Sequence, residues 1–415
     1  LQTEVAAGLF KADPESATFI SEQNRLDQIY HKKLNNVVRG VNTYWLSKPL
    51  RTVFNHKHSL YLDGGTENLR WGDDLSYNND AGVMKDSYRD RMSGGLSLSY
   101  TLGNFQLRNS FSYTYTNSSD SPYGSFADYT SKLPYDVDLD ENGKYLEMTY
   151  GWNGTSGGEN PLYEATLGSY SRDKSWELIN NTELLWNITP HWLLKGQFSV
   201  TKSNSEANDF LDPLSKKNSD RLSLNNVVSG QLNIVTANSL SWDATLTLSY
   251  NRNIKKNSLN FLVGMNATSS TGTGLSIDYR GFPSGTLSSV GYANSIYGMP
   301  SASDSKSRLF GALGTFNYSY DNIYLADVSI RLDGNSEFGA DKRFAPFFSG
   351  GLGLNIHNYS FMKDMEWLER LKIRTTYGVT GKVNFSPYDA QTMYRIINDN
   401  WYKTGLGASL IALGN

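Results

Sequence analysis

The feature that most constrains this chain is a two-residue period of apolar side chains, repeated in segments of about ten residues. In residues 105–115, apolar side chains alternate with polar ones: Phe105, Leu107, Phe111, Tyr113 and Tyr115 against Gln106, Arg108, Ser110, Ser112 and Thr114. Successive side chains of a strand point to opposite faces, so the pattern predicts strands with one apolar and one polar face. The same period recurs at 67–77, 94–102, 175–188, 192–201, 220–235, 240–251, 257–267, 307–320, 324–333, 348–357 and 371–380.

The length of these segments favours strands that cross a membrane. Globular strands average five or six residues, whereas a tilted strand needs about 9–11 to cross a bilayer. In hydrocarbon every backbone N–H and C=O must be paired within the protein, so a spanning sheet must close on itself. We therefore predict an all-β fold, a transmembrane antiparallel β-barrel, in the outer membrane of a bacterium.

The amino-acid composition agrees with a barrel and argues against several kinds of site and partner. The 415 residues are 13% aromatic, mean hydropathy is −0.48, and no apolar run of about 20 residues is present for a spanning helix. A barrel tolerates this polarity because alternate residues face its lumen, while Tyr and Trp suit the membrane interfaces. A soluble all-β protein fits the composition equally well. The absence of cysteine excludes disulfides and thiolate sites, and a net charge of −3 gives no reason to expect nucleic acid.

The connections between predicted strands suggest two different ends of the barrel. Three are long and rich in Ser, Gly, Asn and Asp, at about 117–174, 202–219 and 269–305, and we expect them to be extracellular. Others are short, such as Leu102–Asn104, Ile188–Pro190 and Tyr320–Asn322. We divide the chain into a helical or irregular segment, 1–56, and barrel strands with loops, 57–415. Apolar residues at helical spacing predict one amphipathic helix at about 21–38.

A search for catalytic or metal-binding motifs finds none. No G-x-S-x-G motif is present, and residues 378–382 resemble a phosphate loop only at its end. His56 and His58 would share a strand face, but no third metal ligand is identifiable. Residues 136–143 alternate acidic side chains without the glycine of an EF-hand loop, so calcium there is left open. We predict no enzyme, no cofactor and no metal.

Aromatic residues in the longest predicted loop are the only ligand-binding candidates. Tyr123 and Trp152 are weak candidates for stacking on sugar rings, and the loop also holds Phe126, Tyr129 and Tyr135. Packing of the loops against one another explains the same residues better.

The segment 323–381 carries the most specific motifs. It reads IYLADVSIRLDGNSEFGADKRFAPFFSGGLGLNI and then FMKDMEWLERLKIRTTYGVTGK. It resembles the SusC/RagA family of TonB-dependent outer-membrane transporters. The matching residues are Tyr324, Arg331, Asp333, Gly334, Ser336, Phe338, Phe348, Ser349, Phe361, Met362, Trp367, Leu371, Lys372, Arg374, Tyr377, Gly378, Thr380 and Gly381; departures are Asn335, Phe347 and Lys382. A second resemblance covers 43–100, through TYWLSKPLRT, HSLYLDGG, NNDAGVMKDSYRDR and GGLSLSY.

The resemblance implies more than the periodicity does. It implies part of a 22-stranded barrel, with a plug and a TonB-contacting segment before this chain and further strands after it. It implies import of large nutrients, glycans or oligopeptides, together with a SusD-like surface lipoprotein and the TonB complex. The matched residues are structural, and we expect Asp333–Asn335 to shape a turn in which glycine permits positive φ. No ligand-binding residue is carried over.

Two other functions remain open from the sequence. A passive porin-like channel of about sixteen strands suits the chain length. A soluble or surface β-protein, such as an adhesin or carbohydrate-binding module, suits the composition and would extract without detergent.

Overall fold

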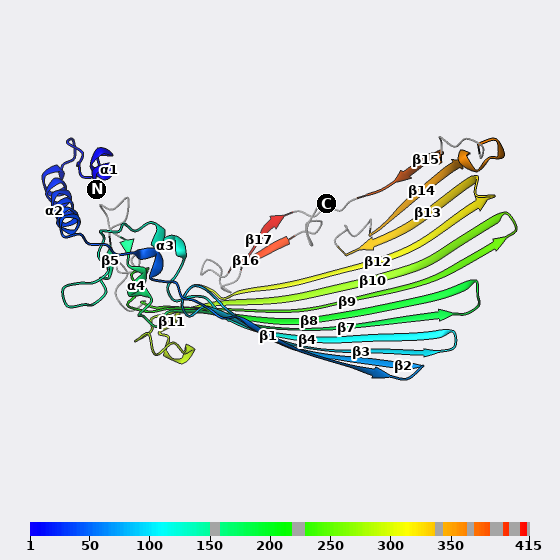
Figure 1. Cartoon of the computed structure of the whole chain (residues 1–415), viewed down its shortest axis with the longest axis horizontal. Helices are drawn as coiled ribbons and strands as arrows, with labels where there is room; N and C mark the ends of the chain where they lie inside the picture. Colours follow the sequence, from blue (N-terminus) through cyan, green and yellow to red (C-terminus); the bar gives the residue numbers. More distant parts are fainter. Residues whose placement is uncertain are drawn as a thin grey trace.

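A computed structural model describes residues 1–149, 158–217, 229–336, 343–362, 369–381, 393–397 and 407–412. Its main element is a 13-stranded antiparallel sheet (Figure 1). The strands are β1 (His56–Gly65), β2 (Leu69–Ala81), β3 (Tyr88–Leu102), β4 (Phe105–Ser119), β7 (Tyr170–Asn187), β8 (Trp192–Leu211), β9 (Gln231–Ile254), β10 (Asn257–Arg280), β12 (Ser301–Tyr320), β13 (Tyr324–Asn335), β14 (Phe344–Asn355) and β15 (Lys372–Val379), with β11 (Ser295–Ile296) beside β10. Each long strand pairs with the next one along the chain.

The predicted all-β fold class is confirmed, and the sheet is open. Within the described part of the chain, β1 and β15 are its edges. Two small pairs lie outside the large sheet: β5 (Met148–Thr149) with β6 (Gly158–Glu159), and β16 (Met393–Ile397) with β17 (Gly407–Ala412).

Several strands are longer than the sequence pattern predicted. Strands β9 and β10 have 24 residues each and pair without interruption from Gln231–Arg280 to Ile254–Asn257. The segments predicted separately at 220–235 and 240–251 are wrong as two strands, because the described part of both belongs to β9; residues 220–228 lie outside the described residues. The bounds of all three predicted loops are too wide. The first loses 117–119 to β4 and 170–174 to β7, the second loses 202–211 to β8, and the third loses 269–280 to β10 and 301–305 to β12. Most of the residues in these extensions are polar or Gly, although Leu275, Ile277 and Tyr279 keep the apolar period at the end of β10.

Short turns and long connections lie at opposite ends of the sheet. At one end, hairpins turn within two to four residues, with positive φ at Gly103 (57°), Lys255 (53°), Asp321 (52°) and Asn322 (56°). The other end carries the described parts of the connections around 120–169, 212–230 and 281–300 (Figure 1). We call these the short-turn end and the loop end. One longer connection, containing η5 (Ile356–Asn358) and η6 (Ser360–Met362), is at the short-turn end.

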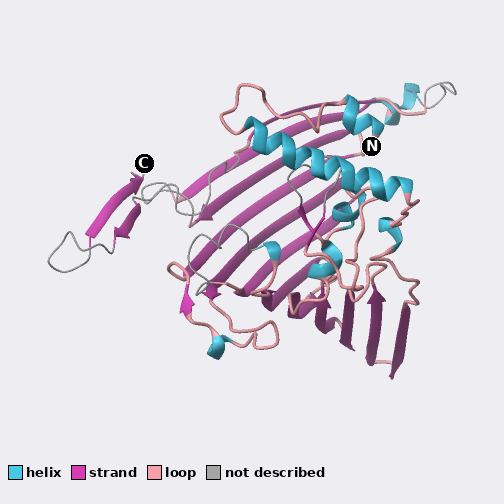
Figure 2. Cartoon of the chain, turned by 90° about the vertical axis from the view of Figure 1, so that its left-hand side faces the viewer, coloured by secondary structure: helices cyan, strands magenta, loops and turns pink. Residues whose placement is uncertain are grey.

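Apart from η5 and η6, the described helices gather at the loop end, in front of the strands in Figure 2. They are α1 (Gln2–Ala6), α2 (Phe19–Val38), η1 (Trp45–Ser47), α3 (Phe126–Thr130), α4 (Pro161–Glu164) and η4 (Val290–Tyr292). The helix predicted at 21–38 is α2. Among the helices described, none is long and apolar enough to cross a membrane.

Two buried apolar clusters also lie at the loop end. Trp45, Tyr129 and Leu162 pack together, joining η1, α3 and α4. Phe210, Leu232 and Phe282 form the second, where β8 and β9 leave the sheet. Among the described residues, these clusters therefore lie in the connections and at the loop-end tips of β8 and β9, while most of the large sheet exposes both faces.

The predicted turn at Asp333–Asn335 is wrong. All three residues continue β13, and Gly334 pairs with Phe344 of β14 in ordinary extended backbone. A Cβ added to Gly334 would lie 2.5 Å from Cε1 of Phe344. Glycine is needed there because an aromatic ring covers the backbone, not because of a positive φ. The matched residues Phe338 and Trp367, and the departure Lys382, lie outside the described residues.

Candidate functional site: a two-faced wall and its outer loops

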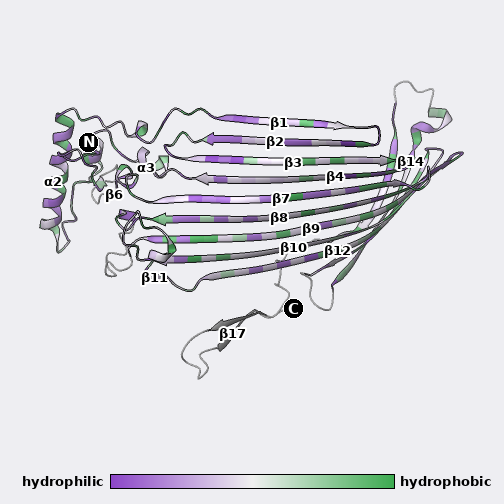
Figure 3. Ribbon diagram, turned by 90° about the horizontal axis from the view of Figure 1, so that it is seen from below, coloured by the Kyte–Doolittle hydropathy of each residue, from purple (hydrophilic) through white to green (hydrophobic). Residues whose placement is uncertain are grey.

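The register of the strands divides the side chains of the sheet into two chemically distinct faces. Residues paired across antiparallel strands share a face, so Phe198, Ala244, Ala267 and Phe310 lie on one cross-strand row. We call the face that contains them the apolar face. Figure 3 shows the resulting interleaving of hydrophobic and hydrophilic residues along the strands. Large apolar side chains on this face are exposed; Met265 is 51% and Val328 49% accessible.

Aromatic side chains mark both limits of the apolar face. At the limit nearer the short turns, the tilted rings of Trp192 and Tyr250 have centroids 4.7 Å apart, and those of Tyr320 and Tyr324 are 6.3 Å apart. At the limit nearer the loops, the ring centroids of Tyr113 and Trp176 lie 6.3 Å apart, and those of Phe198 and Trp242 lie 6.5 Å apart.

The band between these limits has the height of a hydrocarbon layer. On β7, Trp176 and Trp186 are ten residues apart, which is about 33 Å along a strand. At the tilt of about 40° usual in membrane barrels, this spans roughly 25 Å, the height of their apolar band. The apolar face is therefore suited to lipid, with its two aromatic limits at the interfaces.

The opposite face, which we call the polar face, contains a groove of about 720 Å³. Glu183 lies in it and accepts hydrogen bonds from Arg108 (3.3 Å) and Gln197 (3.1 Å), with Lys195 Nζ at 3.1 Å. Asp63, Arg70 and Asp243 line it as well. Such mixed charge cannot face hydrocarbon without large cost, so this face belongs toward an aqueous lumen.

Toward the loop end the polar face becomes a surface of hydroxyl groups. A smaller hollow of about 200 Å³ is lined by Ser199, Thr201, Ser241, Thr268, Ser270 and Ser307, with Asp243 at its side. Ser203 and Ser239 join their hydroxyls across β8 and β9 at 2.7 Å. Neutral donors and acceptors of this kind can bind water or polar solutes without strong charge selection.

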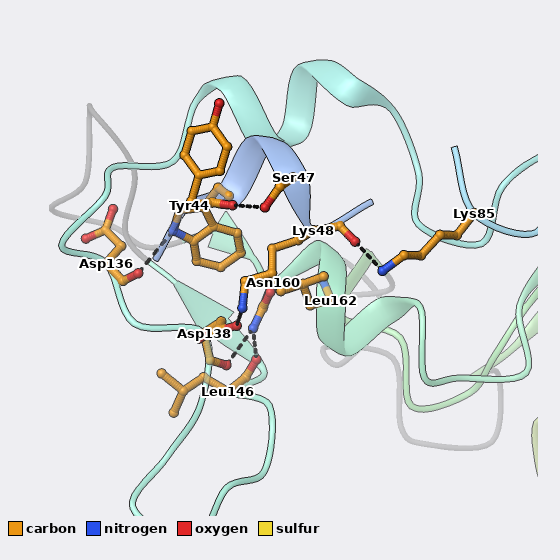
Figure 4. Close-up of polar contacts among 10 residues, drawn as sticks. Tyr44, Ser47, Lys48, Lys85, Asp136, Asp138, Leu146, Asn160 and Leu162 are labelled. Atoms are coloured by element: carbon orange, nitrogen blue, oxygen red, sulfur yellow. Dashed lines mark hydrogen bonds and ion pairs between the residues drawn. The ribbon is translucent and has the colours of Figure 1, made fainter. Parts of the chain in front are cut away.

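At the loop end, the connection after β4 is fixed to the segment before β1 (Figure 4). Trp45 Nε1 donates to the carbonyl of Asp136 at 3.0 Å, and Lys48 Nζ lies 2.8 Å from Asp138 Oδ2. The fully buried Asn160 donates to the carbonyls of Asp138 (3.2 Å) and Leu146 (2.8 Å). These contacts give the long loop a defined shape without regular secondary structure.

The first two helices are held on the same loop by a buried ion pair. Lys33 Nζ lies 2.7 Å from Glu4 Oε1, and Tyr135 Oη donates to Glu4 Oε2 at 2.7 Å. Asn36 Nδ2 donates to the carbonyl of Tyr135 at 3.1 Å. The N-terminal segment is thus part of the loop layer.

The three long connections are also joined to one another. The buried Asp212 accepts the N–H of Gly168 at 2.8 Å, and Glu164 accepts Ser215 Oγ at 2.5 Å. A Cβ on Gly285 would lie 1.7 Å from Asp212 Oδ2, so the third connection approaches the same carboxylate closely. The loops therefore form one continuous layer.

One carboxyl group of this layer has a perturbed acidity. Burial raises the pKa of Asp136 to about 6, while Lys33 and the N–H of Leu133 oppose the rise. A partly ionised carboxyl group at the contact between loop and helices makes this contact sensitive to pH.

The predicted ligand residues fall in this layer as follows. Tyr123 is half-buried against the cluster of Trp45 and Tyr129; its carbonyl accepts the Tyr129 hydroxyl at 2.9 Å, and Lys85 Nζ lies 5.4 Å from its ring centroid. Trp152 lies outside the described residues. The structure does not test a role of either in ligand binding.

The acidic run at 136–143 and the histidine pair are also located. Asp140 Oδ1 accepts the N–H groups of Asn142 and Lys144, both at 2.8 Å, around the turn at Gly143. His56 and His58 lie on edge strand β1 with ring centroids 5.1 Å apart. The residues described contain no group of three or more His, Cys, Asp or Glu placed to hold a metal ion.

Sequence reasoning missed the charged residues that join the loops: Glu4, Lys33, Glu164 and Asp212. Each lies in a polar segment where a single acid or base gives no local signal. Only their burial, with 0–4% of each residue exposed, distinguishes them from the other charged residues.

Comparisons with known proteins agree with this architecture. No protein-family model matches the chain. It is 22% identical to the TonB-dependent receptor SusC of Bacteroides thetaiotaomicron, over 92% of this chain and 39% of that receptor. It is 23% identical to the TonB-dependent receptor P26 of Formosa agariphila, over 90% of this chain and 37% of the relative. The structure of the RagAB peptide transporter superposes with a TM-score of 0.74 at 19% identity, covering all of this chain and 47% of the other.

The chain thus spans less than half the length of the relatives it matches. The predicted similarity of 43–100 and 323–381 to SusC/RagA-like TonB-dependent transporters is confirmed, as are the outer-membrane location and an all-β fold with a large antiparallel sheet, which is open in this structure. The relatives are receptors and transporters rather than enzymes.

Proposed function

We propose that this chain forms part of the barrel wall of a TonB-dependent importer of large nutrients. The observation that carries the proposal is the division of one continuous sheet into a lipid-suited face and a polar face with a groove of about 720 Å³. The similarity to TonB-dependent receptors over 92% of the chain supports the same function.

The positions of the two segments of the chain, 1–56 and 57–415, suggest a different role for each. Residues 57–415 would supply wall strands and extracellular loops, and 1–56 would lie against those loops through Glu4 and Lys33. Short turns at one end and a joined loop layer at the other fit a barrel with its loops outside.

The proposed partners are a SusD-like surface lipoprotein on the loop layer and the TonB complex, acting through a plug region. The proposed substrates are glycans or oligopeptides. Support comes from the relatives alone: one is the receptor SusC, and another structure is that of a peptide importer.

The energised mechanism is tested in a strain that expresses the native full-length protein. Uptake of labelled oligosaccharides and oligopeptides is measured with and without a functional TonB gene. We expect uptake to require both this protein and TonB. Uptake that requires the protein but continues without TonB would support a passive channel instead, and extraction of the protein in plain buffer would contradict any barrel.

The ligand role proposed for Tyr123 and Trp152 is tested separately, by Y123A and W152A. We expect reduced glycan uptake with normal protein level in the membrane. Because Tyr123 also packs on Trp45, Y123F serves as the control: it removes only the hydroxyl and keeps a ring for both packing and stacking. Unchanged uptake in both alanine variants would rule out stacking.

A further inference from the structure

A hollow of about 360 Å³ opens on the apolar face of the sheet. The smallest side chains that line it are on three neighbouring strands: Gly196 of β8, Ala244 of β9 and Ala267 of β10. Larger apolar side chains surround these three: Leu184, Phe198, Leu246, Met265 and Phe310. We call this space the lipid-side hollow.

The strand register explains why the wall is hollow at this place. Along one cross-strand row, Phe198 is followed by Ala244, Ala267 and then Phe310, so two alanines lie between two aromatic rings. The outer two strands of this row are about 14 Å apart, at three strand spacings. A Cβ added to Gly196 would meet its nearest neighbours, Leu184 and Leu246, only at an ordinary 3.7 Å. The protein therefore leaves this space unfilled.

The side chains that line the hollow give water no free polar partner. Gln197, Thr245 and Asn266 share a cross-strand row of the polar face, so they contribute only backbone here. At the edge of the hollow, the hydroxyl of Thr182 accepts from Asn109 Nδ2 at 2.8 Å and donates to Asn180 Oδ1 at 3.3 Å. A buried water usually needs two to four polar partners. The hollow is therefore suited to hydrocarbon and not to water.

The hollow lies in the half of the apolar band that is nearer the loops. Along β9, Ala244 is two residues from Trp242, at the loop-side aromatic limit, and six from Tyr250, at the other limit. Two residues correspond to roughly 7 Å of strand, or about 5 Å of depth at the tilt usual in membrane barrels. With the loops outside, the hollow meets the acyl chains of the outer leaflet.

We propose that the lipid-side hollow binds one acyl chain of the glycolipid in the outer leaflet. Phe198, Met265 and Phe310 are 45%, 51% and 42% exposed, so their side chains are free to contact a chain that lies between them. A chain on a flat wall touches protein on one side, whereas a chain in the hollow also touches the surrounding side chains. Many weak dispersion contacts add up to an appreciable attraction. The site recognises the hydrocarbon chain and not the charge of the headgroup.

The proposal rests on the outer-membrane orientation of the wall and not on import. The lipid-side hollow and the groove that contains Glu183 are on opposite faces of the sheet. Loss of the bound lipid with normal TonB-dependent uptake would therefore contradict neither proposal and would separate the two sites.

The test begins with the lipid that remains on the full-length protein after purification from outer membranes in a neutral detergent. Native mass spectrometry identifies this lipid and, after its removal, measures the binding of added lipid A. We expect the retained lipid to be the glycolipid. Retention of a phospholipid in its place would reject the glycolipid as the source of the chain.

The decisive variant fills the hollow, and a matched variant adds the same groups elsewhere on the same face. A244L/A267L places two larger side chains between Phe198 and Phe310. A312L/A326L is the control, because Ala312 and Ala326 are on the apolar face but do not line the hollow. We expect A244L/A267L to bind lipid A about five-fold more weakly, comparable to losing roughly one or two buried methylene groups. The control should bind it as the unmodified protein does.

Both variants should show the heat-dependent gel mobility of a folded barrel. Should A244L/A267L not fold, the smaller change A267V is compared with A312V, and A267V alone should weaken binding. Unchanged lipid A binding in the filled variant, or an equal loss in the control, would overturn the proposal.

Discussion

Glu4 Oε1 lies 2.7 Å from Lys33 Nζ, and the two side chains are 1% and 3% exposed. The pair fixes α1 and α2 to each other, and Tyr135 extends it to the loop after β4 through Glu4 Oε2. A polar segment that precedes the first strand is thereby attached to the loop layer through a buried charge.

Replacing Glu4 by Gln should release this segment. The change replaces the carboxylate beside the buried Lys33 ammonium by a neutral amide, and removing one charge of a buried pair typically costs about 3–5 kcal/mol. Hydrogen exchange in residues 1–40 should accelerate, while exchange in β7–β10 stays unchanged. The double variant E4L/K33M removes both charges and should exchange more slowly than E4Q. Slow exchange in E4Q itself would show that the pair does not hold the segment.

Attachment of the loop layer should strengthen as pH falls. The pKa of Asp136 is raised to about 6 in the folded protein, chiefly by burial. Its protonated form therefore favours the folded state, and a penalty develops as pH rises from about 4 through 6. The gain from pH 8 to pH 5 should be on the order of 1–2 kcal/mol.

Limited proteolysis of residues 120–149 across this range provides the measurement. Lys33, Glu4 and Lys132 also act on Asp136, so D136N is compared with the unmodified protein. D136N should be cleaved more slowly at pH 8 and should lose most of the pH dependence. An identical pH profile in D136N would assign the effect to another group.

Gly285→Ala should loosen the joined loops. The new Cβ would lie 1.7 Å from Asp212 Oδ2, which must then move away from the N–H of Gly168. We expect a loss of about 1–3 kcal/mol, in the range for overpacking a tight site, read as faster proteolysis within 281–300. Gly291→Ala is the control, since nothing lies within 4 Å of its Cβ position. Equal cleavage of the two variants would contradict the close contact.

The two faces of the sheet can be distinguished by one pair of neighbours. Val328 lies on the apolar face and Ser329 on the polar face of β13. Val328→Arg should reduce the free energy of unfolding in lipid vesicles by about 2–4 kcal/mol, the cost of Arg near the bilayer midplane. Ser329→Arg should change the free energy of unfolding by less than about 1 kcal/mol, which is the usual range for a substitution at the surface. The opposite ranking in a denaturant titration would reverse the assignment of the faces.

The sequence could specify the wall because its signal is local. In a strand, side chains two residues apart lie on the same face and meet the same environment. When one face meets hydrocarbon and the other meets water, apolar and polar residues alternate with a period of two, as they do from Phe105 to Tyr115. Short turns were equally local: Gly103, Asp321 and Asn322 adopt the positive φ that such hairpins require. The strand ends were not predictable, because most residues beyond the apolar band of β8 and β10 are polar on both faces, and the apolar residues at the ends, such as Phe210 and Tyr279, pack with distant segments of the chain.

The sequence by itself determined the alternation of faces, the short turns and the family resemblance, because each of these depends on residues that are close together along the chain. The tertiary structure alone decided which loop residues work together. Glu4 and Tyr135 meet across 131 positions of sequence, and Gly334 is fixed by the ring of Phe344 on the adjacent strand. Contacts of this kind depend on how the chain folds back on itself, so they cannot be predicted from the spacing of residues within a short stretch of sequence.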